Sequence, residues 1–148
     1  MKCVKEKFGG VNVLVNSAGV IGYEHIYDFK KKKPHSVDMY KCLFDTNVWG
    51  VFNVTRLMVG MMAENKTDAN QQRGVIINLS SSAAYDAPST LVAYSSSKAA
   101  VAGMTLPLAR ELAQKGIRVV GINPGFIDSP MTGKTSIKIF PTWRTDII

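Results

Sequence analysis

Short apolar runs alternate along the chain with longer stretches in which apolar residues recur every three or four positions. Residues 11–15, 75–79 and 117–122 form short runs rich in Val and Ile, which predicts three β-strands. The run at 75–79 is apolar at nearly every position, as expected for a strand that is covered on both faces of a parallel sheet. Residues 20–35 and 64–73 show no clear period and are predicted to be loops.

Two stretches show the period of long helices. Residues 36–63 begin with the candidate N-cap Ser36 and carry a stripe at helical spacing. The stripe consists of Tyr40, Leu43, Phe44, Asn47, Val48, Val51, Phe52, Met58, Met61 and Met62. The second helix is predicted over about residues 92–114, with a local bend at Pro107 and an end marked by Gly116.

The order strand, helix, strand, helix, strand predicts the α/β class. We expect a partial Rossmann fold, a doubly wound parallel sheet with about three core strands and two long helices. Residues 1–132 are predicted to form one domain and residues 133–148, which show no period, an irregular tail. The predicted strands end in turns of small or polar residues at 16–19, 80–82 and 123–125. Because ligands of such sheets bind at the carboxyl ends of the strands, we expect the site where these turns meet.

The candidate chemistry lies around Tyr94 and Lys98, which are four residues apart and therefore share one face of a helix. A neighbouring ammonium favours the phenolate form of a tyrosine, and Ser81 follows the strand at 75–79 closely enough to join the pair. Together they predict a proton-transfer site. A structural interpretation remains, because this spacing is common on helix surfaces and Ser side chains often bond the backbone of turns. Asn47 is either a satisfied structural amide or a site residue.

Composition indicates a globular domain with a core of its own. The 148 residues are 46% hydrophobic and 20% charged, with a net charge of +7. The charge is concentrated locally at Lys30–Lys33, which we interpret as a solvated loop. A nucleic-acid contact is the weaker interpretation, because no aromatic residues interleave with the lysines.

Other classes of site are not expected from the sequence. Cys3 and Cys42 lie far apart and are predicted to be reduced thiols of an intracellular protein. His25 and His35 have no ligand spacing around them, so no metal is expected. No apolar run is long enough to span a bilayer, and no signal or transit peptide is recognised.

Several motifs occur together in the order and at the spacing of a known family. They are Asn16-Ser17-Ala18-Gly19, Asn47, Ser81, Tyr94-x-x-x-Lys98 and Pro124-Gly125. With these motifs, most of residues 8–131 resembles the short-chain dehydrogenases/reductases, which use NAD(P) on a Rossmann sheet. The resemblance implies an oxidoreductase that interconverts a secondary alcohol and a ketone, of the 3-hydroxyacyl-CoA or hydroxysteroid class.

The resemblance also implies a role for each motif. Tyr94 would be the acid or base at the substrate oxygen, Ser81 would hydrogen-bond that oxygen, and Asn47 would support a proton relay. Lys98 would hold the nicotinamide ribose and lower the pKa of Tyr94. Ser129 stands in the place of the family's Thr that touches the nicotinamide carboxamide. The implied cofactor-binding residues are Asn16, Ala18, Gly19, Tyr94, Lys98, Pro124, Gly125, Ile127 and Ser129.

The sequence departs from the family in its phosphate-binding motif. The Thr-Gly-x-x-x-Gly-x-Gly turn and the acidic residue that holds the adenosine ribose have no counterpart, and the first strand aligns with the family's fourth. We therefore expect the catalytic middle of a dehydrogenase that binds NAD, or NADP, poorly and is inactive as this truncated chain. The alternative is a non-catalytic remnant that acts as a protein-interaction or dimerisation module.

The resemblance further implies the partners and the location of the protein. It implies an acyl-CoA or steroid substrate, a role in lipid metabolism, and a homo-oligomer formed through the two long helices. A mitochondrial location follows from the same resemblance, with the cytoplasm as the other expectation. Direct contact with nucleic acid or with a membrane is not expected.

Overall fold

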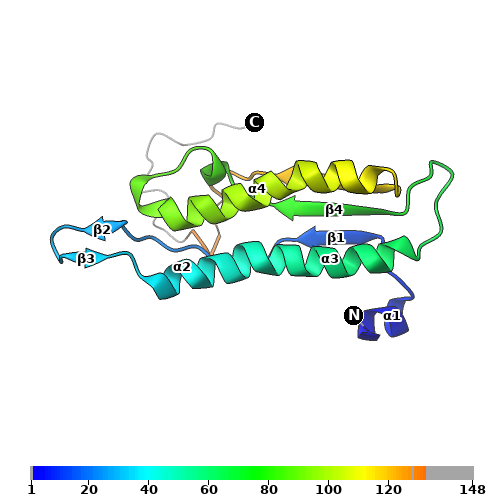
Figure 1. Ribbon diagram of the computed structural model, residues 1–148, viewed down its shortest axis with the longest axis horizontal. Helices are drawn as coiled ribbons and strands as arrows, with labels where there is room; N and C mark the ends of the chain where they lie inside the picture. The colour runs from blue at the N-terminus through cyan, green and yellow to red at the C-terminus, as the bar shows by residue number, and fades with distance from the viewer. Residues whose placement is uncertain (1, 128, 133–148) are drawn as a thin grey trace.

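Three parallel strands form the main sheet of the computed structural model, which describes residues 2–127 and 129–132 (Figure 1). The strands are β1 (Val13–Asn16), β4 (Gly74–Leu79) and β5 (Ile117–Ile122), in the order β1-β4-β5. In a parallel sheet the carboxyl ends of all strands lie at one edge. The predicted α/β class and partial Rossmann fold are confirmed, whereas the predicted tail at 133–148 lies outside the described residues.

Two long helical stretches connect the strands. The first consists of α2 (Val37–Phe44), the π-helical turn η1 (Asp45–Trp49) and α3 (Gly50–Ala63), and the second is α4 (Val92–Ala113). Ser36 caps α2 as predicted, because its Oγ accepts a hydrogen bond from the Met39 N–H at 3.2 Å. The short helix α1 (Lys2–Phe8) precedes β1.

Helices α3 and α4 of the two long stretches pack on the same face of the sheet. Leu14, Ile76 and Val119 occupy paired positions on the three strands. They pack together with Met62 of α3 and Leu112 of α4, and Ile76 and Met62 are fully buried. Figure 1 shows α3 and α4 running alongside the strands. This shared cluster is the main hydrophobic core.

The opposite face of the sheet is mostly apolar, with Arg118 as its charged residue, and in the described part of the chain it is not covered by a helix. It carries Val13 and Val15 of β1, and Val120 and Ile122 of β5. Val13 is 57% exposed and Ile122 is 45% exposed. Ile77 of β4, between them, is only partly buried, so the prediction that this strand is covered on both faces holds on one face alone.

The segment predicted as a loop at 20–35 contains a hairpin, which corrects that prediction. Strand β2 (Tyr27–Asp28) pairs antiparallel with β3 (Lys33–Pro34). Asp28 Oδ1 accepts hydrogen bonds from the N–H groups of Lys30 and Lys31, each at 3.0 Å, and this closes the turn. Strands of two residues are too short to show a hydrophobic period. In Figure 1 the hairpin extends beyond the start of α2.

The turn that follows α4 gives a first prediction for stability. Gly116 has φ +68°, and a Cβ atom there would lie 2.1 Å from the Gln71 carbonyl oxygen. Gly116→Ala is therefore expected to destabilise the fold by more than the about 1–2 kcal/mol that left-handed backbone alone costs. Urea unfolding measures this. Gly103→Ala is the control, since Gly103 lies within α4 with no atom near the position of its Cβ, and this change is expected to stabilise slightly.

Candidate active site

The end of β4 and the start of α4 bring together the side chains of Ser81, Tyr94 and Lys98. Ser81 follows β4 and caps the 3₁₀ turn η2 (Ser82–Ala84), where its Oγ accepts a hydrogen bond from the Ala83 N–H at 3.1 Å. The Ser81 side chain is also within hydrogen-bonding reach of the Tyr94 hydroxyl. Lys98 Nζ lies 5.9 Å from the centre of the Tyr94 ring. The three polar groups therefore lie at one place, although they come from different elements.

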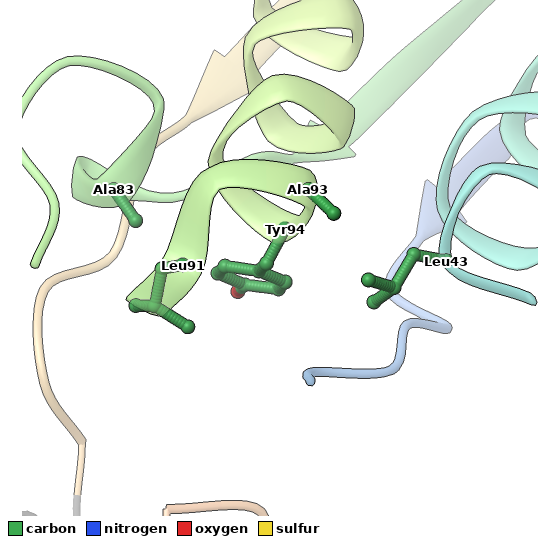
Figure 2. Close-up of a cluster of buried hydrophobic side chains, with 5 residues drawn as sticks. All are labelled: Leu43, Ala83, Leu91, Ala93 and Tyr94. Carbon is green, nitrogen blue, oxygen red and sulfur yellow. The ribbon is translucent and has the colours of Figure 1, made fainter. Parts of the chain in front are cut away.

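The Tyr94 ring is packed in a small hydrophobic cluster (Figure 2). In this view the ring lies between Leu91 and Leu43, and Ala83 and Ala93 complete the cluster. Tyr94 as a whole is only 8% exposed. Close packing of this kind restricts the orientation of the ring and so holds its hydroxyl in place.

Burial decides the protonation of both titratable groups. Loss of water around the phenol raises the pKa of Tyr94, the hydrogen bond from Ser81 lowers it, and the nearby Tyr23 raises it further. Burial lowers the pKa of the Lys98 ammonium, whose Nζ donates to the Leu79 carbonyl at 3.0 Å. Lys98 is not among the causes of this shift, whose net direction is upward, so the predicted lowering of the pKa of Tyr94 by Lys98 stays a prediction. Tyr94 is thus a protonated phenol at neutral pH.

Asn47, in the middle of η1, joins the loop after β1 to α4. Its Oδ1 accepts a hydrogen bond from the Val20 N–H at 2.8 Å. Its Nδ2 donates to the Val20 carbonyl at 2.9 Å and to Ser97 Oγ at 3.0 Å. Ser97 Oγ donates in turn to the Tyr94 carbonyl at 2.7 Å. These contacts make Asn47 a satisfied structural amide that is connected to the backbone of Tyr94.

A cavity of about 630 Å³ lies beside Tyr94 and Ser81. Most of the residues predicted to bind the cofactor line it, namely Gly19, Tyr94, Lys98, Pro124, Gly125, Ile127 and Ser129. Asn16 and Ala18 are not among the lining residues. The cavity also has apolar walls that the sequence did not single out, including Ile21, Leu91 and Met131. No periodic signal marks these residues, because they lie in loops and a 3₁₀ turn.

Asn16 belongs to a buried network in the core. Its Nδ2 donates to Thr55 Oγ1 at 2.9 Å and to Asn78 Oδ1 at 2.8 Å. The three side chains join β1, α3 and β4, and each residue is at most 8% exposed. Thr55 and Asn78 lie 39 and 62 residues from Asn16 in sequence, so no local pattern could indicate the pairing. The predicted contact between Asn16 and the cofactor stays a prediction.

The part of the cavity next to Gly19 has space beside two hydrogen-bonding side chains. A Cβ atom on Gly19 would lie 3.3 Å from Asn47 Oδ1 and 3.4 Å from Lys98 Nζ, so the glycine leaves space beside two hydrogen-bonding groups. In the segment that follows β5, Thr132 Oγ1 donates a hydrogen bond to the Ile127 carbonyl at 2.7 Å and accepts one from the Ser129 N–H at 3.1 Å. The space at Gly19 is compatible with the predicted nicotinamide site, and the cofactor contacts themselves stay a prediction.

Comparison with known sequences and structures defines the class of protein. The sequence profile of the short chain dehydrogenase family matches residues 1–139, and the chain belongs to this family of oxidoreductases, which use a nicotinamide dinucleotide. Among its relatives is the human 3-hydroxyacyl-CoA dehydrogenase type-2, 46% identical over 127 residues, with 86% of this chain and 49% of the relative covered. The Drosophila melanogaster enzyme of the same name is 40% identical over 139 residues, with 94% and 54% covered. The chain thus spans about half the length of these relatives.

Solved structures agree with the family. The 3-hydroxyacyl-CoA dehydrogenase type-2 of Mycobacterium avium has a TM-score of 0.83 at 26% identity, with 94% of this chain and 56% of that chain covered. A gluconate 5-dehydrogenase of Burkholderia cenocepacia, solved in complex with NADP and tartrate, has a TM-score of 0.76 at 26% identity, with 89% and 47% covered. In the described residues no helix could cross a membrane. No group of His, Cys, Asp and Glu in that part of the chain could hold a metal ion.

Proposed function

We propose that this chain carries the catalytic groups of an NAD(P)-dependent oxidoreductase that interconverts a secondary alcohol and a ketone. The observation that carries the proposal is the convergence of Ser81, Tyr94 and Lys98 on one cavity at the carboxyl edge of a parallel sheet. Membership of the family supports the same class of reaction. The raised pKa of Tyr94 keeps a proton available at the cavity wall.

Each side chain has a distinct task in this proposal. In the reducing direction the Tyr94 hydroxyl donates its proton to the carbonyl oxygen of the substrate, which becomes the alcohol hydroxyl. The Ser81 hydroxyl hydrogen-bonds the same oxygen and holds it near Tyr94. The Lys98 ammonium stabilises the phenolate left on Tyr94. When bound, the nicotinamide cofactor supplies the hydride to the carbonyl carbon, and oxidation of the alcohol returns the hydride and the proton.

The substrate in this proposal is a 3-hydroxyacyl-CoA and its 3-oxo partner, or a hydroxysteroid. The apolar side chains of Ile21, Leu91 and Met131 on the cavity wall suit an acyl chain or a steroid ring. The names of the relatives, 3-hydroxyacyl-CoA dehydrogenase type-2, support the acyl-CoA class. A role in mitochondrial lipid metabolism follows from that substrate class and the same resemblance.

Turnover at increasing cofactor concentration tests this function. With acetoacetyl-CoA as substrate, we expect slow oxidation of NADH or NADPH whose rate rises linearly with cofactor. The reason is that the residues lining the cavity would hold only the nicotinamide end of the cofactor. We expect a Kd for the cofactor above about 1 mM, which corresponds to a binding free energy weaker than about −4 kcal/mol. Saturation at micromolar cofactor would contradict the weak binding, and no substrate-dependent oxidation at all would contradict the function.

The second candidate is an interaction or dimerisation module that has no catalytic activity. The observation in its favour is an aromatic surface on the long helical stretch. Trp49 is 52% exposed and Phe52 is 47% exposed, their ring centres lie 6.1 Å apart, and the Arg56 guanidinium lies 6.0 Å from the Trp49 ring centre. Exposed aromatic side chains together with an Arg are typical of protein interfaces. A homo-oligomer formed through the two long helices would use this surface. Such an oligomer is compatible with either candidate function.

A further inference from the structure

The wall segment is defined as residues 19–24; its first three residues line the cavity, and both of its ends are fastened to other elements. Gly19, Val20 and Ile21 line the cavity. At the first end, Asn47 bonds both the N–H and the carbonyl of Val20. In the middle, a Cβ atom on Gly22 would lie 2.7 Å from Met39 Sδ, so this part of the wall lies directly against α2. The comparison with the short chain dehydrogenase family assigns no role to Glu24, which lies at the second end.

Glu24 fastens that second end to two elements at once. Its backbone N–H donates to the Thr90 carbonyl at 2.9 Å, in the 3₁₀ turn η3 (Ser89–Leu91) that leads into α4. Its Oε2 accepts a hydrogen bond from the N–H of Ser36, the N-cap of α2, at 3.0 Å. His35 Nδ1 lies 3.6 Å from the same oxygen. A carboxylate that accepts from a backbone N–H forms one of the stronger classes of hydrogen bond.

The wall held in this way is in contact with the surroundings of Tyr94. Ile21 packs against the cluster that contains Tyr94, Leu43 and Leu91. Tyr23, next to Glu24, lies near enough to Tyr94 to contribute to the raised pKa of Tyr94. A shift of the wall away from α4 would therefore change the packing of Tyr94 and open it to water.

We propose that Glu24 is a positioning residue, which holds the wall at residues 19–23 against Tyr94 by bridging η3 to the N-terminus of α2. Glu24 touches neither substrate nor cofactor in this proposal and acts through the wall. The inference rests on the proposed function, because it takes Tyr94 as the reacting group. The hydrogen bond to Ser36 requires an acceptor at the end of a side chain of this length. Gln supplies that acceptor, whereas Asp is one methylene too short and Ala has none.

Hydrogen exchange followed by mass spectrometry tests the bridge. In Glu24→Ala we expect the amides of residues 20–23 and 36–39 to exchange about tenfold faster, because a charge-assisted hydrogen bond is lost. Glu24→Gln is expected to keep nearly the protection of the unaltered chain. Glu111→Ala is the matched control, a removed carboxylate on the exposed surface of α4. If Glu24→Ala does not fold, Glu24→Asp serves in its place, with the same loss of protection expected.

Titration of Tyr94, observed by NMR with labelled tyrosine, tests the consequence for the site. The signal is assigned by its absence in Tyr94→Phe. We expect the pKa of Tyr94 to fall toward its ordinary value of 10.0 in Glu24→Ala, and to stay raised in Glu24→Gln and Glu111→Ala. A variant that only destabilises another part of the fold would leave the pKa of Tyr94 unchanged.

The two measurements separate this inference from the proposed function, because neither depends on turnover. Unchanged exchange and unchanged Tyr94 titration in Glu24→Ala would overturn the positioning role and leave the function standing. Faster exchange with an unchanged titration would also overturn it, because the bridge would then not reach Tyr94. An inactive chain that shows both expected changes would contradict the function and leave the bridge established.

Discussion

Replacement of Tyr94 by Phe is expected to lower the rate of substrate-dependent NADH oxidation by about 10²–10⁴-fold, the usual contribution of general acid–base catalysis. The ring stays in its cluster with Leu43 and Leu91, so the packing is conserved while the proton donor is removed. Stability is expected to change little, because the hydroxyl interacts with Ser81 at the cavity rather than within the core. Rates of the two proteins at equal cofactor concentration provide the measurement.

Tyr85→Phe is the matched control for this experiment. Tyr85 follows η2 in the same Ser-rich segment as Ser81, but it is 75% exposed and does not line the cavity. Its substitution is expected to leave the rate unchanged. A Tyr94→Phe protein that keeps half the rate would show that another group donates the proton.

The pH dependence of the same reaction follows from the direction of the Tyr94 shift. Reduction needs the protonated phenol, and the raised pKa keeps Tyr94 protonated through the neutral range. Titration of Tyr94 is therefore expected to leave the rate of reduction unchanged up to the ordinary phenol pKa of 10.0 and to lower the rate only above that value. Oxidation needs the phenolate and is expected to become faster as the pH rises toward that value.

The second large effect is expected for stability, in Asn47→Ala. The change removes the partner of the Val20 N–H and carbonyl, around a residue that is 1% exposed, and it removes the donor to Ser97 Oγ, which keeps its hydrogen bond to the Tyr94 carbonyl. Each buried polar group left without a partner costs about 1–3 kcal/mol. We expect the free energy of unfolding to fall by roughly 3 kcal/mol, since some of these groups reach water after the change. Urea unfolding provides the measurement.

Asn53→Ala is the control for Asn47→Ala on the same helical stretch. Asn53 Oδ1 accepts a hydrogen bond from Arg56 Nε at 2.9 Å in an exposed position, and water can replace that contact. Its substitution is expected to change stability by less than about 0.5 kcal/mol. Equal losses in the two variants would contradict the assignment of Asn47 to a buried network.

Local periodicity was enough to predict the strands, the long helical stretches and the cap at Ser36. The same kind of signal placed Tyr94 and Lys98 on one helix face, since four residues make about one turn. Neither the hairpin of β2 and β3 nor the η1 turn could be predicted. Strands of two residues and a single π-helical turn are too short to produce a recognisable hydrophobic period in the sequence.

Long-range contacts explain the remaining differences. The pairing of the Asn16 side chain with Thr55 and Asn78 could not be predicted, because these residues are distant in sequence, and the predicted contact of Asn16 with the cofactor stays a prediction. The pKa of Tyr94 was expected to fall because the sequence shows the neighbouring Lys98 and does not show burial. Desolvation of the phenol is a property of the whole cluster around it, so its direction follows from the packing of several segments.

The π-helical turn η1 also sets the rotational phase of the helix that contains it. Leu43 and Met62 are nineteen positions apart, and in a regular α-helix such residues point about 100° away from each other. The turn takes up one additional residue, which is about 100° of rotation. Both side chains can therefore point inward, Leu43 to the cluster around Tyr94 and Met62 to the sheet. The same helical stretch thereby contributes to both hydrophobic clusters, whereas with a regular α-helical pitch Leu43 and Met62 would point in different directions.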